Sequence, residues 1–450
     1  MDILALLQPF NAIVATTTVR QMSRVVTAML ALTGRVTMLN IARWATSKGG
    51  SYRSVQRFFH TVIPWAELLW LFFRKHLLCP QDEYIVAGDE VVVSKAGKQT
   101  YGLDRFFSSL CQRAIPGLGF FALSLVSIQQ RRSFPIAIEQ VVRTPEEKAA
   151  TQERKKHKSK QQGRAARGRG RPKGSKNKSK VEVALNAELL RIKAMLIKLL
   201  ARLLGWLALK YLVMDGHFGH NAALQMARQC QLHLISKLRA DAALYLPYEG
   251  PYAGCGPRRK YGDKLNYQAL PQQHLKSISV EDGLEKRIYQ ATLLHKEFAQ
   301  ALNVVIIVKT NLQSGACAHV VLFSSDLELP FDKLIDYYSL RFQIEFNFRD
   351  AKQFWGLEDF MNVSQTAVTN AANLSLFMVN LVHLSLLNFR KSDPLCSVLD
   401  LKSYYRGYRY VSETIKMLPQ TLDDDSISQI LSKVAALGRI HAPQSTLSFS

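Results

Sequence analysis

The chain has 450 residues, 48% of them hydrophobic, which is enough to bury a substantial core and to form two or three domains. Its formal net charge of +24 at pH 7 points to a polyanionic partner, nucleic acid before membrane. The six cysteines are scattered and include no C-x-x-C pair, which argues against zinc ligation and indicates reduced thiols in a cytosolic protein.

Residues 1–78 are expected to form a helical domain. Apolar side chains recur at helical spacing through 22–32 and 55–73, and Ser51 occupies the N-cap position before the second stretch. Basic residues on or near the turn between these stretches would suit DNA binding, although a plain helical bundle explains the same pattern equally well.

Residues 79–238 change to strands alternating with helices, and an acid ends each of two strands. Tyr84–Gly88 leads into Asp89, and Tyr211–Met214 leads into Asp215. Ligand chemistry in α/β sheets gathers at strand ends, although an acid there can instead cap a turn or a helix. The other elements expected in this part are strands at 120–129, 135–142 and 232–237 and helices at 181–207 and 221–230.

A strongly basic segment at residues 148–180 interrupts this part of the chain. It holds 14 Lys and Arg against one acid, so it supplies +13 of the net charge, and with almost no apolar residues it is expected to be disordered. Its Arg-Gly-Arg-Pro core, with Arg169, Arg171 and the following Lys173, resembles an AT-hook, in which arginines enter a narrow minor groove. A generic basic linker, bound to DNA by counterion release alone, fits the same residues.

The remainder of the chain is expected to hold an insertion, the end of the main domain and a tail. Residues 239–310 are rich in Tyr, Gly and Pro and then alternate polar and apolar, which predicts an inserted, mainly β subdomain. Residues 311–395 resume the main domain with a strand at 320–324, and 396–450 are predicted as a C-terminal helical tail.

Two apolar runs, 189–214 and 370–389, are long enough to mimic membrane spans. Five cations break the first run, and asparagines and a histidine lie within the second. Both are therefore expected to be buried or amphipathic helices of a soluble protein with no membrane partner.

Four polar residues are expected to share one face of a helix late in the main domain. At about 100° per residue, Tyr338, Arg341, Glu345 and Lys352 fall within an arc of roughly 60°, and Arg349 joins them. One carboxylate among cations and a phenol suits a metal-binding acid presented to a phosphate backbone. An amphipathic surface helix with i,i+4 ion pairs explains the same pattern. An offset apolar stripe should face the core: Tyr337, Leu340, Ile344, Phe348, Ala351 and Trp355.

Asp89, Asp215 and Glu345 together have a chemical rationale that none of them has alone. Three carboxylates can hold two Mg²⁺ ions about 4 Å apart, one activating the attacking oxygen and one stabilising the leaving oxygen. Hard oxygen ligands suit Mg²⁺. Glu90 should point to the opposite face of the strand from Asp89, so it is not assigned to the metal.

The spacing Y-x2-R-x3-E-x6-K, met by Tyr338, Arg341, Glu345 and Lys352, resembles the YREK signature of bacterial insertion-sequence DDE transposases with a β insertion. Similar stretches are GDEVVVSKAGKQTYGLDRFF at the first Asp, MDGHFG at the second and RRKYGDKLN in the insertion, and the likeness covers about residues 1–395. The chain departs from the family in two places. Glu90 and Val91 stand where Asp and Thr are frequent, and Phe342 stands where Trp is common.

The resemblance implies an α/β, ribonuclease-H-like fold in which a mixed sheet is flanked by helices. It implies Asp89, Asp215 and Glu345 as ligands of Mg²⁺, for which Mn²⁺ can substitute. The signature residues Tyr338, Arg341 and Lys352, with Arg349 beside them, would bind the phosphates of the transposon end.

The implied activity is cut-and-paste transposition. Water would first attack the DNA backbone at the transposon end. The released 3′-hydroxyl would then act as the nucleophile, finally on target DNA. The partners are double-stranded transposon ends and target DNA, bound by a homodimer in the bacterial cytoplasm and associated with the nucleoid. Two alternatives stay open: a catalytically inactive DNA-binding protein derived from a transposase, and a hydrolytic nuclease on the same fold.

Overall fold

The computed structural model describes residues 2–45, 50–108, 111–149, 153, 179–252, 254–418 and 423–436. The AT-hook-like residues Arg169, Arg171 and Lys173 lie outside the described residues, so the prediction for that segment stays untested.

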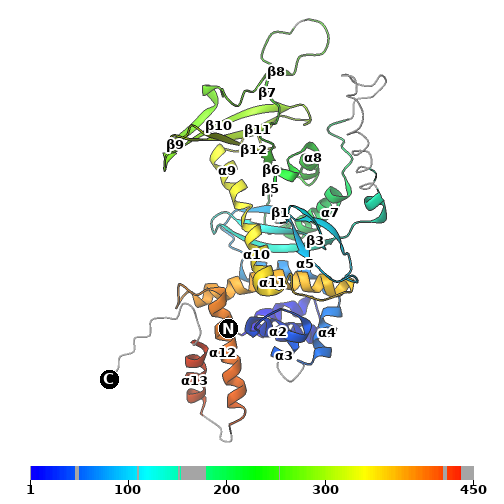
Figure 1. Cartoon of the computed structure of the whole chain (residues 1–450), viewed down its shortest axis with the longest axis vertical. Coiled ribbons are helices and arrows are strands. Elements are labelled where there is room, and N and C mark those ends of the chain that lie inside the picture. The colour runs from blue at the N-terminus through cyan, green and yellow to red at the C-terminus, as the bar shows by residue number, and fades with distance from the viewer. Residues whose placement is uncertain are drawn as a thin grey trace, which may run out of the picture.

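A mixed sheet runs through the middle of the molecule (Figure 1). The central strand β1 (Tyr84–Ser94) is antiparallel to β3 (Arg113–Ser127) and parallel to β5 (Tyr211–Met214). β6 (His233–Leu238) follows parallel to β5, and β4 (Arg132–Val141) pairs antiparallel with β3. The order β4-β3-β1-β5-β6 confirms the predicted ribonuclease-H-like mixed sheet. A short strand, β2 (Asp104–Ser108), pairs with the beginning of β3.

The predicted β insertion extends the same sheet instead of forming a detached unit. Beyond β6 the sheet continues through three antiparallel strands in the order β12, β11 and β10. Figure 1 shows this extension rising above the rest of the fold. Its elements are β7 (Leu244–Pro247), β8 (Tyr261–Lys264), η3 (Gln272–His274), β9 (Leu275–Glu281), β10 (Leu284–His295), β11 (Leu302–Asn311) and β12 (Cys317–Ser324).

Helices cover both faces of the first half of the sheet. α10 (Gln343–Trp355) contacts β1 and β4, and α11 (Gln365–Phe389) packs on α10 and β4. α7 (Ala187–Leu203) contacts β3, and α8 (Asn221–Gln229) contacts β6. Among the described helices, α11 alone is long and apolar enough to cross a membrane, but 78% of its apolar window is buried in the protein. Its apolar surface is therefore part of the core.

The N-terminal residues form the expected helical bundle. Its elements are α1 (Ile3–Leu7), η1 (Gln8–Ala12), α2 (Thr16–Ala31), α3 (Met38–Trp44), α4 (Tyr52–His60) and α5 (Trp65–His76). The Ser51 hydroxyl accepts a hydrogen bond from the Ser54 amide, as expected of an N-cap. The helix predicted through 55–73 is instead two helices, because Pro64 caps α5 and has no amide hydrogen with which to continue α4.

The C-terminal helices α12 (Val398–Ile415) and α13 (Asp424–Ala436) lie beside this bundle (Figure 1). Three cations on one face of α12 bind carbonyl groups at the ends of N-terminal helices. Lys402 Nζ donates to the Met29 carbonyl at 3.0 Å, and Arg406 Nε donates to the Ala31 carbonyl at 3.2 Å. Arg409 makes the third such bond, to Ala45 beyond α3. Such carbonyls lack partners within their own helices, so these cations join the two ends of the chain.

Candidate active site

Asp89 lies in the middle of β1, beside the point where its parallel neighbour β5 ends. Gly88 pairs with Met214, so Asp215 follows β5 next to Asp89. The strand continues through Asp89 because Val91 and Val93 remain buried. Side chains alternate along a strand, so Asp89 faces α10 and the exposed Glu90 faces α7, as predicted for Glu90.

Asp215 is held in a tight turn between β5 and α8. Its carboxylate oxygen Oδ1 accepts a hydrogen bond from the His217 amide at 3.1 Å, which caps the short helix η2 (Gly216–Phe218). Its backbone carbonyl accepts from the Ser236 hydroxyl of β6 at 2.6 Å. A β-carbon at Gly219 would overlap the Lys237 carbonyl, so this turn packs directly on β6. These contacts fix the backbone that carries Asp215.

The helix predicted to carry the YREK residues is interrupted, and that prediction is wrong. α9 (Phe331–Leu340) ends before Arg341, and α10 begins at Gln343. At this break the Phe342, Ile344 and Glu345 amides bond three residues back, at 3.0 to 3.1 Å, which tightens the chain locally. The apolar stripe is nevertheless buried as predicted: Tyr337, Leu340, Ile344, Phe348, Ala351 and Trp355.

Arg341 joins two of the three acids. Its Nη1 lies 2.8 Å from Asp89 Oδ2, and its Nη2 lies 2.9 Å from Glu345 Oε1. The Arg341 side chain is 13% exposed, whereas that of Glu345 is 40% exposed. The guanidinium is thus inserted between a strand and a helix, and each of its terminal nitrogens binds a different carboxylate.

The acids influence one another electrostatically. Burial raises the pKa of Asp89 to about 6, and the negative charges of Asp215 and Glu345 add to this rise, while Arg341 opposes it. Burial also raises the pKa of Tyr338, whose hydroxyl lies close enough to interact with Arg341. The cluster therefore carries more negative charge than one guanidinium balances.

The donor set fits a hard divalent cation. Asp89, Asp215 and Glu345 offer carboxylate oxygens from three separate elements, and the negative charges of the other two acids add to the rise that burial causes in the Asp89 pKa. Among the described residues, no three acidic, His or Cys side chains are already arranged around one metal position. Arg341 lies between two of the three acids and supplies the positive charge.

The other signature cation, Lys352, lies further along α10 and is also paired within the protein. Lys352 Nζ donates to the Val92 carbonyl at 2.9 Å and pairs with Glu358 at 2.8 Å. Arg349 is 60% exposed, pairs with Asp350 at 3.1 Å and lies over the Phe346 ring, so it is turned away from the acids. Tyr338 and Arg341 thus gather with the acids, and Lys352 and Arg349 do not touch them.

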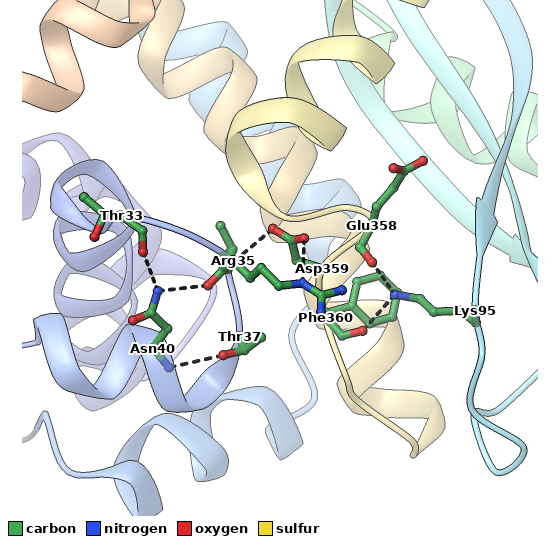
Figure 2. A network of polar contacts seen from close by, with 9 residues as sticks. Thr33, Arg35, Thr37, Asn40, Lys95, Glu358, Asp359 and Phe360 are labelled. Atoms are coloured by element: carbon green, nitrogen blue, oxygen red, sulfur yellow. Dashed lines mark hydrogen bonds and ion pairs between the residues drawn. The ribbon is translucent and has the colours of Figure 1, made fainter.

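A junction beyond α10 connects this helix to the N-terminal bundle (Figure 2). Asp359 accepts hydrogen bonds from the Val36 amide at 3.0 Å and Arg35 Nε at 3.5 Å. Lys95, close to the end of β1, donates to the Glu358 and Phe360 carbonyls at 2.9 and 2.7 Å. Lys95 is therefore a structural cation, and burial lowers its pKa to about 8.

Sequence reasoning missed Glu188, which lies on the opposite face of β1. Its carboxylate Oε1 is 3.4 Å from His217 Nε2, and both line a cavity of about 280 Å³ with Glu90, Arg143 and Arg191. Glu188 stands in the first turn of an amphipathic helix, where an acid is commonplace. Nothing in the local sequence therefore distinguishes it.

Comparison with protein-family models shows which family the sequence matches. A family model described as DDE superfamily endonuclease matches residues 6–299, which is more than half of the chain. The matched range includes Asp89 and Asp215 and ends before Glu345. A comparison with curated proteins finds no match.

Proposed function

Because the chain belongs to the DDE superfamily of endonucleases, we propose that it is a transposase that cuts DNA at transposon ends and joins the ends to target DNA. The observation that carries the proposal is the convergence of Asp89, Asp215 and Glu345, which come from three elements far apart in the sequence. Polynucleotidyl transfer at a phosphate needs such a set of carboxylates.

In this proposal Asp89, Asp215 and Glu345 hold Mg²⁺, for which Mn²⁺ can substitute. The bound ions would activate the attacking oxygen and stabilise the charge on the leaving oxygen. Tyr338 and Arg341 lie at the acids, so they would position the scissile DNA strand. Arg is suited to this role because its planar fork can bind a phosphate with two parallel hydrogen bonds.

Several cations away from the acids would bind the flanking DNA. Arg258 and Arg259 of the insertion lie 5.9 and 4.7 Å from the rings of Tyr252 and Tyr248, and cations beside aromatic rings suit nucleic-acid binding. Lys352 and Arg349 would add phosphate contacts. The AT-hook-like residues, Arg169, Arg171 and Lys173, would add further affinity for DNA.

The proposed assembly is a homodimer on DNA in the bacterial cytoplasm. Two transposon ends must be brought together, and a dimer is the simplest arrangement that does so.

The proposed domains of the chain are residues 1–78 for DNA binding, 79–238 with 311–395 for catalysis, 239–310 for the insertion and 396–450 for the tail.

The products of a single reaction distinguish this activity from that of a hydrolytic nuclease on the same fold. The protein is incubated with Mg²⁺, a DNA fragment carrying the candidate ends and a supercoiled target plasmid. A transposase releases the ends and yields plasmid covalently joined to them. Cleaved ends with no joined plasmid would identify a nuclease, and binding without any cleavage would identify an inactive DNA-binding protein.

A further inference from the structure

We propose that Arg341 makes metal binding depend on DNA. In the DNA-free protein its guanidinium bridges Asp89 and Glu345, and it leaves them when a DNA phosphate becomes its partner. The two acids are then free to bind a divalent cation. This inference rests on the proposed function and adds the order in which that site is filled.

The two acids do not accept hydrogen bonds from every donor of the Arg341 guanidinium. Its two terminal nitrogens bind Asp89 and Glu345 at 2.8 and 2.9 Å, but Nε is buried and has no hydrogen-bond partner in the described part of the chain. A buried donor without an acceptor is costly, so a better acceptor would be favoured. A phosphate can accept from Nε and a terminal nitrogen together, in the bidentate geometry that Arg prefers.

A divalent cation and Arg341 compete for these acids. Arg341 binds one oxygen of each carboxylate, and two cations placed together in a partly buried site repel each other strongly. Metal binding therefore favours the displacement of Arg341. Displacement without a new anionic partner would leave a largely buried guanidinium unpaired, which is strongly unfavourable.

The position of Arg341 in the chain suits a residue that changes partner. It follows the last residue of α9 and precedes α10, so it lies at the break between two helices. Lys352 offers a contrast, because it pairs with the Val92 carbonyl and Glu358 and touches neither acid. The competition with metal is thus particular to Arg341.

Linkage makes this competition reciprocal. If DNA raises the affinity for metal by withdrawing Arg341, metal raises the affinity for DNA by the same factor. Metal-loaded acids would then be rare in the free protein and frequent in the complex. The catalytic acids would then hold metal mainly when DNA is already bound.

The test measures Mn²⁺ binding to the full-length protein without DNA, by the electron paramagnetic resonance signal of free Mn²⁺. If Arg341 occupies the acids most of the time, Arg341→Gln should bind Mn²⁺ on the order of tenfold more tightly than wild type. Arg131→Gln is the matched control, since that arginine pairs with Asp336 at 2.8 Å and with none of the three acids, and it should bind as wild type does. Adding Asp89→Asn to Arg341→Gln should abolish the gain.

Arg341→Lys covers the case in which Arg341→Gln does not fold. Lysine keeps the charge but cannot bridge two acids with a rigid fork, so this variant should also bind Mn²⁺ more tightly than wild type. Adding DNA that carries the candidate ends should tighten Mn²⁺ binding by wild type, and by much less in Arg341→Gln.

Equal or weaker Mn²⁺ binding by both Arg341 variants would overturn the inference. If wild type still cut and joined DNA in that case, the inference would fail and the proposed function would stand. If Asp89→Asn changed Mn²⁺ binding in no background, both would fail, because the metal site itself would be misplaced.

Discussion

At the scale of single residues, Gly356 determines how α10 leads into the junction with the N-terminal bundle. It ends α10 in the left-handed region, with φ of 78°, and a β-carbon there would overlap the side chain of Val36. Glycine is required at Gly356 for both conformation and space.

Gly356→Ala should therefore destabilise the protein by about 1 kcal/mol from backbone strain and by about 1–3 kcal/mol more from overlap with Val36. Gly205→Ala is the matched control, because Gly205 has φ of 77° and open space around it. Urea unfolding measures the free energy of unfolding of both variants. The loss in Gly205→Ala reports backbone strain alone, and the additional loss in Gly356→Ala reports overlap with Val36. Equal losses would show that contact with Val36 contributes nothing.

At the scale of elements, α12 docks on the N-terminal bundle through the buried cation Lys402. Its Nζ donates to the Met29 carbonyl and lies 4.8 Å from the centre of the Trp355 ring. Burial lowers the pKa of Lys402 to about 8, and the nearby positive charge of Arg406 contributes. The folded protein thus holds this proton less tightly than the unfolded chain, whose lysine has the ordinary value of 10.5.

Stability should accordingly rise with pH between about 8 and 10.5, because in that window the unfolded state binds more protons. Below about pH 8 the lysine is charged in both states and the contribution is constant. Lys402→Met lacks the titrating group, so the melting temperature of wild type relative to this variant should increase from about pH 8 to about pH 10. A constant or falling difference would contradict the account.

The elements also show where sequence reasoning succeeded and where it stopped. The strands at Tyr84–Gly88 and Tyr211–Met214 were predictable, because short apolar runs next to acids are local signals, but β1 continues through Asp89 and does not end there. The break at Arg341 was not, since neither Gly nor Pro marks it. Its ion pair with Asp89 spans 252 residues, and the bond from Lys402 to Met29 spans 373, and no local pattern encodes either.

At the scale of the whole molecule, charge is distributed so that the described fold and the basic segment should both contact DNA. Residues 148–180 supply +13 of the +24 net charge, which leaves +11 on the rest of the chain. Counterion release makes each phosphate contact a contribution to the salt dependence of binding.

Replacing residues 154–178 with a Gly/Ser segment of equal length should weaken DNA binding and flatten its dependence on salt. Each lost phosphate contact should reduce the slope of log K against log salt by about 0.9. Binding titrations over a range of salt concentrations measure this slope. An unchanged slope would refute the placement of this segment on DNA.

The central claim is that Asp89, Asp215 and Glu345 form one metal-dependent catalytic site. The most direct test measures cleavage of DNA carrying the candidate ends by wild type and by Asp89→Asn, Asp215→Asn, Glu345→Gln and the control Glu90→Gln. Cleavage by wild type should require Mg²⁺ or Mn²⁺, stop with a chelator, and be lost in the three acid variants. The control should cleave, because Glu90 is exposed on the opposite face of β1. Metal-dependent cleavage that survives any of the three acid substitutions would contradict the account.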